Sequence, residues 1–219
     1  ALVVNGGTLQ YTGGSAQTTD RLFTIGVIGA TLDASGGPLT IGSGGGAIAF
    51  SSSASPASLT LTGTGSGTLS AGLGNSGAGT NTTSLIKSGS GTWTLTAANT
   101  FSGNTTVSNG KLYLNGANSG TTAISVAAGA TLGGSGSAAA ATATVAGAGT
   151  VEGGSGGSGS LTLAGLSLAN TSIVRAANVG NYAVSPAIDV TGGGALTTAG
   201  TVTVKLSGNV PSGGGTFHI

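Results

Sequence analysis

Cysteine and methionine are absent from the 219-residue chain, and charged residues are scarce, with five basic and four acidic side chains. Without cysteine there can be no disulfide bond, no thiolate metal site and no cysteine nucleophile. Charged residues make up 4% of the chain, whereas about 25% is usual in soluble proteins. Because the net charge is only +1, no basic surface can follow a phosphate backbone, and we expect no nucleic acid among its partners.

Long apolar runs and helical patterns are also missing. No window approaches the ~20 consecutive apolar residues of a membrane-spanning helix, so we expect no membrane insertion by this segment. No stretch has a convincing apolar stripe with the 3.6-residue period of a helix, and residues 138–141 are too short a run to predict one. Residues 1–7 lack the basic and apolar regions of a signal peptide, so we expect any export signal to have been removed or to lie outside this chain.

Glycine is abundant, with 46 residues, and runs such as residues 153–160 have the composition of a flexible linker. Disordered chains, however, usually combine low hydrophobicity with high charge. This chain is 38% hydrophobic and nearly uncharged, and its mean hydropathy is +0.37. We therefore predict an ordered protein.

Short triplets of a small residue, threonine and an apolar residue recur along the chain. The apolar members Trp93, Leu112, Leu132 and Val151 follow one another at intervals of 19 or 20 residues. A fixed period of this length is the sequence signature of a repeat architecture. The triplets are Gly7-Thr8-Leu9, Ala30-Thr31-Leu32, Gly67-Thr68-Leu69, Gly91-Thr92-Trp93, Gly110-Lys111-Leu112 (with lysine in place of threonine), Ala130-Thr131-Leu132, Gly149-Thr150-Val151 and Gly200-Thr201-Val202.

Each repeat has the alternating pattern of short β-strands. Trp93 and Leu95 share one face, whereas Thr92, Thr94 and Thr96 take the other. One rung of such strands cannot bury its apolar face alone, but rungs stacked ~4.8 Å apart join these faces into one core. We predict an all-β parallel solenoid of about 20-residue rungs, with about eleven rungs in a rod on the order of 50 Å long. The predicted core residues are Trp93, Leu95, Phe101, Val107, Leu112, Leu132 and Val151.

Three segments, residues 87–96, 99–107 and 109–112, resemble the autotransporter-associated β-strand repeat, which is also called the passenger-associated transport repeat. The family pattern is roughly Lys-x-Gly-x-Gly-Thr-Leu-x-Leu, then Asn-Thr-Tyr-x-Gly-x-Thr-x-Val, then Gly-x-Leu. Here Trp93 replaces the first leucine and Phe101 replaces the tyrosine. The resemblance implies a right-handed parallel β-helix that is exported to a bacterial cell surface or beyond, and it implies no catalytic residue.

The chain is expected to form one elongated domain. Solenoid rungs are predicted over residues 1–160 and are most regular over 84–160, and a broader C-terminal β section over 161–219 continues or caps them. Three asparagine-glycine pairs predict turns that need a positive φ. These pairs are Asn5-Gly6, Asn109-Gly110 and Asn115-Gly116.

The acidic residues are too dispersed to predict an enzyme. A glycan-processing β-helix, the main alternative, needs carboxylates that converge on one groove. Asp20, Asp33, Glu152 and Asp189 fall on distant rungs, so we expect them to be solvated surface residues, with Asp20 forming a weak ion pair with Arg21.

The single histidine, His218, is expected to be an exposed bystander. One histidine without cysteine or clustered acids cannot build a zinc site. We therefore predict no catalytic residue, no metal site and no cofactor.

Two binding functions remain as alternatives. Tyr113 is out of phase with Leu112 and Leu114, which predicts an exposed ring that could contact surface glycans. Outward threonines could form a flat ladder like those of ice-binding solenoids, although their irregular spacing favours simple strand propensity. The threonine groups concerned are Thr60 and Thr62, Thr92, Thr94 and Thr96, Thr142 and Thr144, and Thr201 and Thr203.

The two ends of the chain are predicted to carry unpaired strands. Leu2, Val3 and Val4 begin like a bare strand, and Phe217 and Ile219 end like one. Open strand edges template pairing with another chain, and a near-zero charge removes repulsion. We therefore expect a secreted structural or adhesive solenoid that self-associates end to end into a fibre; alternatively, the bare ends are those of a fragment.

Overall fold

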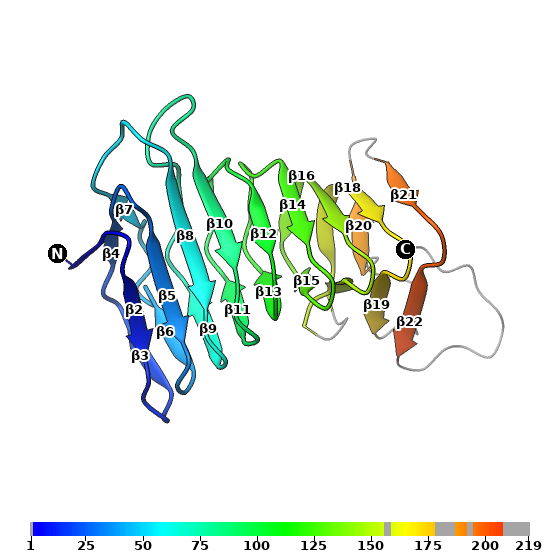
Figure 1. The fold of residues 1–219 in the computed structure, drawn as a ribbon, viewed down its shortest axis with the longest axis horizontal. Coiled ribbons are helices and arrows are strands. Elements are labelled where there is room, and N and C mark those ends of the chain that lie inside the picture. The colour runs from blue at the N-terminus through cyan, green and yellow to red at the C-terminus, as the bar shows by residue number, and fades with distance from the viewer. Residues whose placement is uncertain (1, 156–158, 178–186, 192–194, 208–219) are drawn as a thin grey trace.

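The computed structural model is a stack of β-strand rungs (Figure 1), and it describes residues 2–155, 159–177, 187–191 and 195–207. The described residues contain no helix, and so no helix long and apolar enough to cross a membrane. Parallel strands stack as a β-solenoid of about eight turns, with ~23 residues per rung. The predicted fold class is therefore confirmed, although the rungs are longer and fewer than the sequence period suggested.

Sheet A closes one side of the first rungs and consists of parallel strands in the order β1-β4-β7. Beyond β7 this side continues as loops joined by isolated bridges. The strands are β1 (Leu2–Val4), β4 (Phe23–Ile25) and β7 (Ala49–Phe50).

Sheet B runs along the whole stack in the order β2-β5-β8-β10-β12-β14-β16-β18-β20, and β21 also pairs with β18. The strands are β2 (Thr8–Tyr11), β5 (Ala30–Ala34), β8 (Ala57–Thr62), β10 (Thr83–Lys87), β12 (Thr105–Val107), β14 (Ala123–Val126), β16 (Ser137–Val145), β18 (Leu161–Leu168), β20 (Ile188–Val190) and β21 (Leu196–Thr198).

Sheet C forms the remaining side in the order β3-β6-β9-β11-β13-β15-β17-β19-β22. The strands are β3 (Gln17–Thr19), β6 (Leu39–Ile41), β9 (Ser66–Leu69), β11 (Thr92–Leu95), β13 (Lys111–Leu114), β15 (Thr131–Gly134), β17 (Thr150–Gly153), β19 (Ile173–Ala177) and β22 (Thr203–Ser207).

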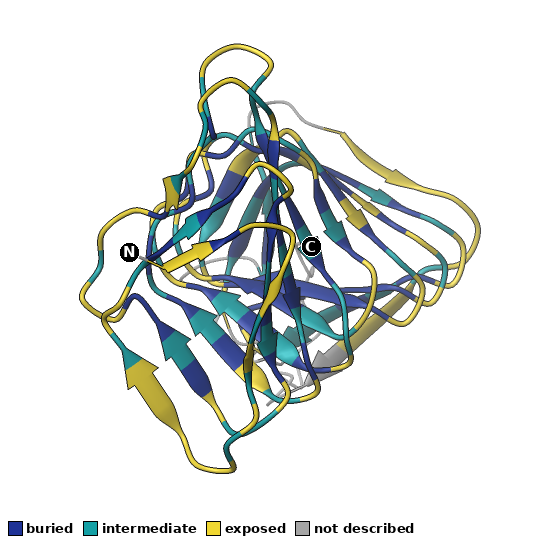
Figure 2. Ribbon diagram, turned by 60° about the vertical axis from the view of Figure 1, so that its left-hand side comes forward, coloured by how far each residue is buried: buried dark blue, intermediate teal, exposed yellow. Residues whose placement is uncertain are grey.

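The core lies between the sheets, because alternate residues of each strand point inward. The strands of the central rungs consist mostly of buried and intermediate residues, whereas the corner loops are largely exposed (Figure 2). The seven core residues named from the sequence are at most 1% exposed. Register aligns six of them, all except Phe101, which lies outside the strands, with equivalents on neighbouring rungs. The inner row of sheet B is Leu32, Leu61, Lys87, Val107, Val126, Val145 and Leu168.

Loop length explains the difference in period. Within this inner row, Lys87, Val107, Val126 and Val145 are 19 or 20 residues apart, as the sequence predicted. Earlier rungs carry longer corner loops, so that Leu61 lies 29 residues after its partner Leu32. These loops add residues without adding rungs, so the 20-residue period overestimates the number of turns.

Two buried asparagines connect the central rungs on the side where sheet A is replaced by loops. Asn99 and Asn118 are 1% exposed, and Asn99 Nδ2 donates to Asn118 Oδ1 at 3.0 Å. Asn99 Oδ1 accepts from the backbone N–H of Leu73 at 2.9 Å. The side chains thereby join three successive rungs and satisfy buried polar groups where no sheet is present.

Candidate functional site

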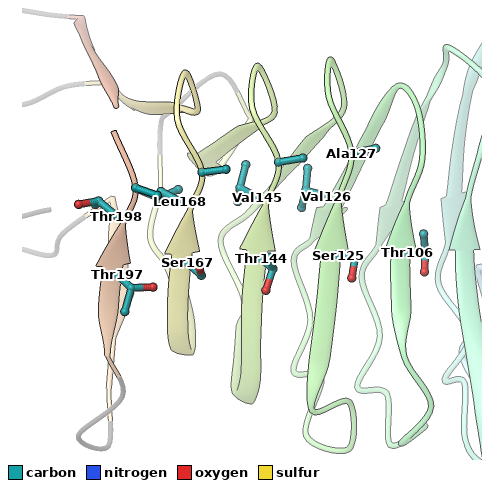
Figure 3. A pocket seen from close by; sticks show the side chains of 13 residues that line it. Thr106, Ser125, Val126, Ala127, Thr144, Val145, Ser167, Leu168, Thr197 and Thr198 are labelled. Atoms are coloured by element: carbon teal, nitrogen blue, oxygen red, sulfur yellow. The ribbon is translucent and has the colours of Figure 1, made fainter. Parts of the chain in front are cut away.

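A row of hydroxyl side chains runs along the outer face of sheet B. Thr106, Ser125, Thr144, Ser167 and Thr197 occupy the same position on successive strands, and Figure 3 shows them side by side. The same register continues through Ile86, the single apolar member among the described strands, to Thr60, Thr31 and Thr8. We call these Ser and Thr residues the hydroxyl row.

Small side chains accompany the hydroxyl row where the strands end. Together with the hydroxyls from Thr106 to Thr197, they line a shallow groove of about 480 Å³. No charged residue lines the groove, so its chemistry is that of regularly spaced hydroxyls beside methyl groups. The alanines are Ala127, Ala146, Ala169 and Ala199.

The predicted threonine ladder is divided between two faces. Thr60 and Thr144 belong to the hydroxyl row, whereas Thr94 lies on the outer face of sheet C between Thr68 and Tyr113. Sequence spacing missed the row because loops of different lengths separate its members. The signal that would have found it is a Ser/Thr-x-Ala motif, present at residues 125–127, 144–146, 167–169 and 197–199.

The outer row of sheet C changes from threonines to a polar cluster. Successive strands place Tyr113, Gly133, Glu152, Arg175 and Lys205 in line. The tyrosine hydroxyl donates to Glu152 Oε1 at 2.6 Å, although the two residues lie two rungs apart. The contact is possible because Gly133, on the rung between them, has no side chain. A Cβ atom there would meet a Tyr113 ring carbon at 2.7 Å and Glu152 Cγ at 2.9 Å. On the other side, Arg175 Nη1 lies 3.5 Å from Glu152 Oε2.

Two sequence expectations are wrong at this cluster. Tyr113 is not an exposed ring, because it is 5% exposed and lies against the space above Gly133. Glu152 is not a solvated acid but is fully buried. Alternation identified the outward direction of Tyr113 correctly, but it carries no information about what a neighbouring rung places over an outward side chain.

Replacing Tyr113 by phenylalanine tests the buried hydroxyl–carboxylate contact. We expect Tyr113→Phe to lower the free energy of unfolding by about 1.5–3 kcal/mol, because a buried carboxylate loses a hydrogen bond. Urea denaturation followed by circular dichroism measures the change. Tyr11→Phe is the matched control, since that hydroxyl donates to the backbone oxygen of Ser15 in an exposed loop. Equal losses from the two variants would contradict the burial argument.

Lys87 is a core residue that was not predicted from the sequence. It is fully buried in the inner row of sheet B, between Leu61 and Val107. Its Nζ donates to the backbone oxygens of Ser88 at 2.5 Å, Gly89 at 2.9 Å and Asn109 at 3.1 Å. Burial lowers the pKa of Lys87 from 10.5 to about 8. The burial of Lys87 could have been predicted from strand alternation, because it follows the inward-facing Leu85 by two residues.

The other acids remain apart. Asp20 is exposed and lies 3.8 Å from Arg21, the weak surface pair that was expected. Asp33 is half-buried on β5 and accepts from Gln10 Nε2 at 2.8 Å, and Asp189 is half-buried on β20. Within the described part of the chain, no three His, Asp or Glu side chains form a group that could hold a metal ion.

The predicted end strands are only partly described. Leu2 and Val3 are exposed on β1, whereas Val4 is buried. Phe217, Ile219 and the predicted bystander His218 lie outside the described residues.

Comparison with known proteins identifies one segment of the solenoid. The family model of the passenger-associated-transport-repeat matches residues 85–113. No curated protein and no solved structure matches the chain. The matched segment runs from β10 to β13 and includes Lys87, Trp93 and the Asn109-Gly110 turn. The chain therefore contains, within its β-solenoid, a passenger-associated transport repeat of the kind found in autotransporter passengers.

Proposed function

We propose that this chain is a non-catalytic structural section of an exported passenger, located outside the cell or on a bacterial surface. The observation that carries the proposal is that a passenger-associated transport repeat forms rungs within an otherwise continuous stack. Each rung pairs its backbone with the next and buries its apolar row against it, so neighbouring rungs stabilise one another. The result is a rigid support with few charged groups, suited to a stalk or an adhesive surface.

Export can be tested by display. The chain is placed between a cleavable signal peptide and an outer-membrane translocator in a Gram-negative host, with an epitope inserted after Gly79 in an exposed loop. We expect antibody to label intact cells and added protease to leave a fragment that contains residues 85–113. The translocator's own passenger is the positive control. An epitope that becomes accessible only after lysis would contradict the proposal.

The same proposal includes end-to-end self-association. Strands β1, β2 and β3 are edge strands of the three sheets, so their outer backbone groups face no described strand. Exposed apolar side chains accompany this edge: Leu2, Val3, Val27 and Ile28. A second copy that presents a strand in parallel register would satisfy both the backbone groups and the apolar side chains.

Light scattering of the purified chain tests self-association. We expect the mean mass to rise with concentration and Val3→Lys to suppress the rise, because a charged side chain blocks strand addition at an edge. Thr122→Lys controls for the added charge, since Thr122 is exposed elsewhere on the rod. A monodisperse monomer at all concentrations would exclude the fibre.

The hydroxyl row favours ice binding as a second candidate function. Hydroxyls repeat ~4.8 Å apart along a parallel sheet, beside methyl groups and without charge. If this surface orders water, the wild-type chain should show thermal hysteresis, and Thr144→Lys should abolish it by placing a charge in the groove. Thr122→Lys, outside the groove, should leave it unchanged. Freezing behaviour no different from that of an inert protein would eliminate this function.

A further inference from the structure

Three asparagine-glycine pairs occur in the chain, and the fold treats one of them differently. Asn5, Asn109 and Asn115 are all exposed, so water reaches each of them. In such a pair, a single new bond between the glycine nitrogen and the asparagine side-chain carbon Cγ closes a five-membered ring. What separates the three sites is therefore the hydrogen bonding of the carboxamide and of the glycine N–H.

At Asn5 both groups are engaged with the neighbouring rung. Asn5 Oδ1 accepts from the N–H of Ile28 at 2.9 Å. The N–H of Gly6 donates to the backbone oxygen of Gly29 at 2.7 Å. These contacts hold the carboxamide along the rod axis and occupy the glycine nitrogen.

At Asn115 the arrangement is similar. Asn115 Oδ1 accepts from the N–H of Ser135 at 3.2 Å on the following rung. The N–H of Gly116 donates to the backbone oxygen of Leu95 at 3.1 Å on the preceding rung. Reaction between the carboxamide and the glycine nitrogen would break contacts in both directions along the rod.

At Asn109 the two groups face each other instead. The N–H of Gly110 donates to Asn109 Oδ1 at 2.7 Å. The carboxamide is thus folded back onto the following nitrogen, and its oxygen, which is bonded to the carbon that must be attacked, lies 2.7 Å from the attacking atom. A fold that already holds the two reacting groups side by side removes much of the entropic part of the barrier to the intramolecular reaction.

Lys87 adds a chemical reason for reactivity at this turn. Its Nζ donates to the backbone oxygen of Asn109, the carbonyl of the peptide bond that contains the Gly110 nitrogen. As that nitrogen loses its proton, negative charge spreads onto the carbonyl oxygen by amide resonance. An ammonium already placed at this oxygen stabilises the charge as it develops.

The fold also prevents replacement of the glycine by a slower-reacting residue. Gly110 has a φ of 65°, which side chains rarely adopt. A Cβ atom at this position would meet Gly89 O at 2.6 Å and Lys87 Nζ at 2.8 Å. The tight corner around Lys87 therefore requires glycine at position 110, the residue after which asparagine is chemically most labile.

We propose that Asn109 is a site of spontaneous deamidation that the folded rung selects over Asn5 and Asn115. The Gly110 nitrogen attacks Asn109 Cγ, so that an N–Cγ bond forms and the Cγ–Nδ2 bond breaks. The proton of the Gly110 N–H leaves with Nδ2 as ammonia, and a succinimide remains. One water then opens the ring to aspartate or isoaspartate, and no electrons are exchanged.

The product changes the corner that Lys87 holds. Either outcome adds one negative charge to a chain whose net charge is +1. Isoaspartate also inserts a carbon into the backbone beside the Asn109 carbonyl, which displaces the acceptor of the ammonium. Deamidation thus marks the age of the passenger repeat at the point where adjacent rungs are joined.

Tryptic peptide mass spectrometry tests the proposal, because the three pairs fall in separate peptides, residues 1–21, 88–111 and 112–175. The purified folded chain is incubated at pH 7, where the buried Lys87 is still an ammonium, and sampled over days. We expect Asn109 to deamidate about ten-fold faster than Asn5 or Asn115, since only its geometry is close to that of the reaction. In guanidinium chloride the three rates should converge. Equal rates in the folded chain would overturn the proposal.

Lys87→Met tests the part played by the ammonium. We expect the ratio of the Asn109 rate to the Asn115 rate to fall about three-fold or more, because the developing charge loses its partner. Using the ratio removes any general loosening of the variant, which would raise both rates. Lys205→Met, at an exposed position, controls for the lost charge. An unchanged ratio in Lys87→Met would show that the lysine takes no part.

Discussion

Replacing Trp93 by alanine is expected to lower the free energy of unfolding by about 3–5 kcal/mol, the loss typical of a large buried aromatic side chain. Trp93 is fully buried in the middle of the stack, and its indole N–H donates to the backbone oxygen of Thr62 at 2.8 Å. The alanine variant loses the apolar contacts, leaves a cavity and leaves the Thr62 oxygen without this donor. Because rungs stabilise their neighbours, the damage extends to both sides of the substituted rung.

The register explains how a tryptophan fits into a row of smaller side chains. Its partner on the preceding rung is Gly67, and a Cβ atom there would meet Trp93 ring carbons at 2.5 Å. We expect Gly67→Ala to cost about 1–3 kcal/mol by overpacking. In a Trp93→Leu background the same change should cost little or stabilise the strand, since alanine is more favourable than glycine there.

The wild type, Gly67→Ala, Trp93→Leu and the double variant form a double-mutant cycle for this pair. Urea denaturation followed by circular dichroism measures the free energy of unfolding of each. Thr94→Ala is the control for Trp93→Ala, because Thr94 lies on the outer face of the same strand and is only half-buried. The absence of coupling between positions 67 and 93 would show that these residues do not face each other, and the register would be wrong.

Raising the pH from 8 to 10.5 is expected to stabilise the wild-type chain relative to Lys87→Met by about 3 kcal/mol. The pKa of Lys87 is lowered by burial from 10.5 to about 8. Between these values the unfolded chain binds more protons at this residue than the folded chain does, so the free energy of unfolding rises with pH. Below about pH 8 both states carry the charge, and the full cost of burying the ammonium is present.

Unfolding free energies of both proteins, measured at intervals across this pH range, isolate the contribution of Lys87. All other ionisable groups are common to both proteins, so their effects on the free energy of unfolding cancel in the difference. Lys205→Met corrects for the loss of one positive charge at an exposed position. Parallel pH profiles for the wild type and Lys87→Met would mean that the buried ammonium is not destabilised by its surroundings.

Lys87 shows that strand alternation predicts which side chains face the core but not which groups they bind there. The alternation of residues 83–87 places Lys87 in phase with the buried Leu85, but a lone charged side chain in an aliphatic row gives no indication of its partners. Those partners are carbonyl oxygens of two different corners, one following β10 and one following β12. Only the stacking of rungs brings them to one nitrogen.

The same limit applies to the outer faces. The outward direction of Tyr113 follows from its position between Leu112 and Leu114 in the sequence. Its burial, however, depends on the absence of a side chain at Gly133 and on the carboxylate of Glu152, 39 residues away. The hydroxyl row is a further case, because its members are separated by loops of unequal length. Contacts across rungs decide both features, and sequence separation does not reveal them.

By itself, the sequence determined that this chain is an all-β repeat protein with Trp93, Leu112, Leu132 and Val151 facing the interior. Period-two alternation and a rung-length repeat are local patterns, and burial of apolar side chains leaves few ways to satisfy them. The tertiary structure alone decided which outward residues meet, where the charged groups are buried, and which asparagine faces its own glycine. These outcomes depend on register between rungs, and register is set by loop lengths and by the fit of individual side chains across a spacing of ~4.8 Å.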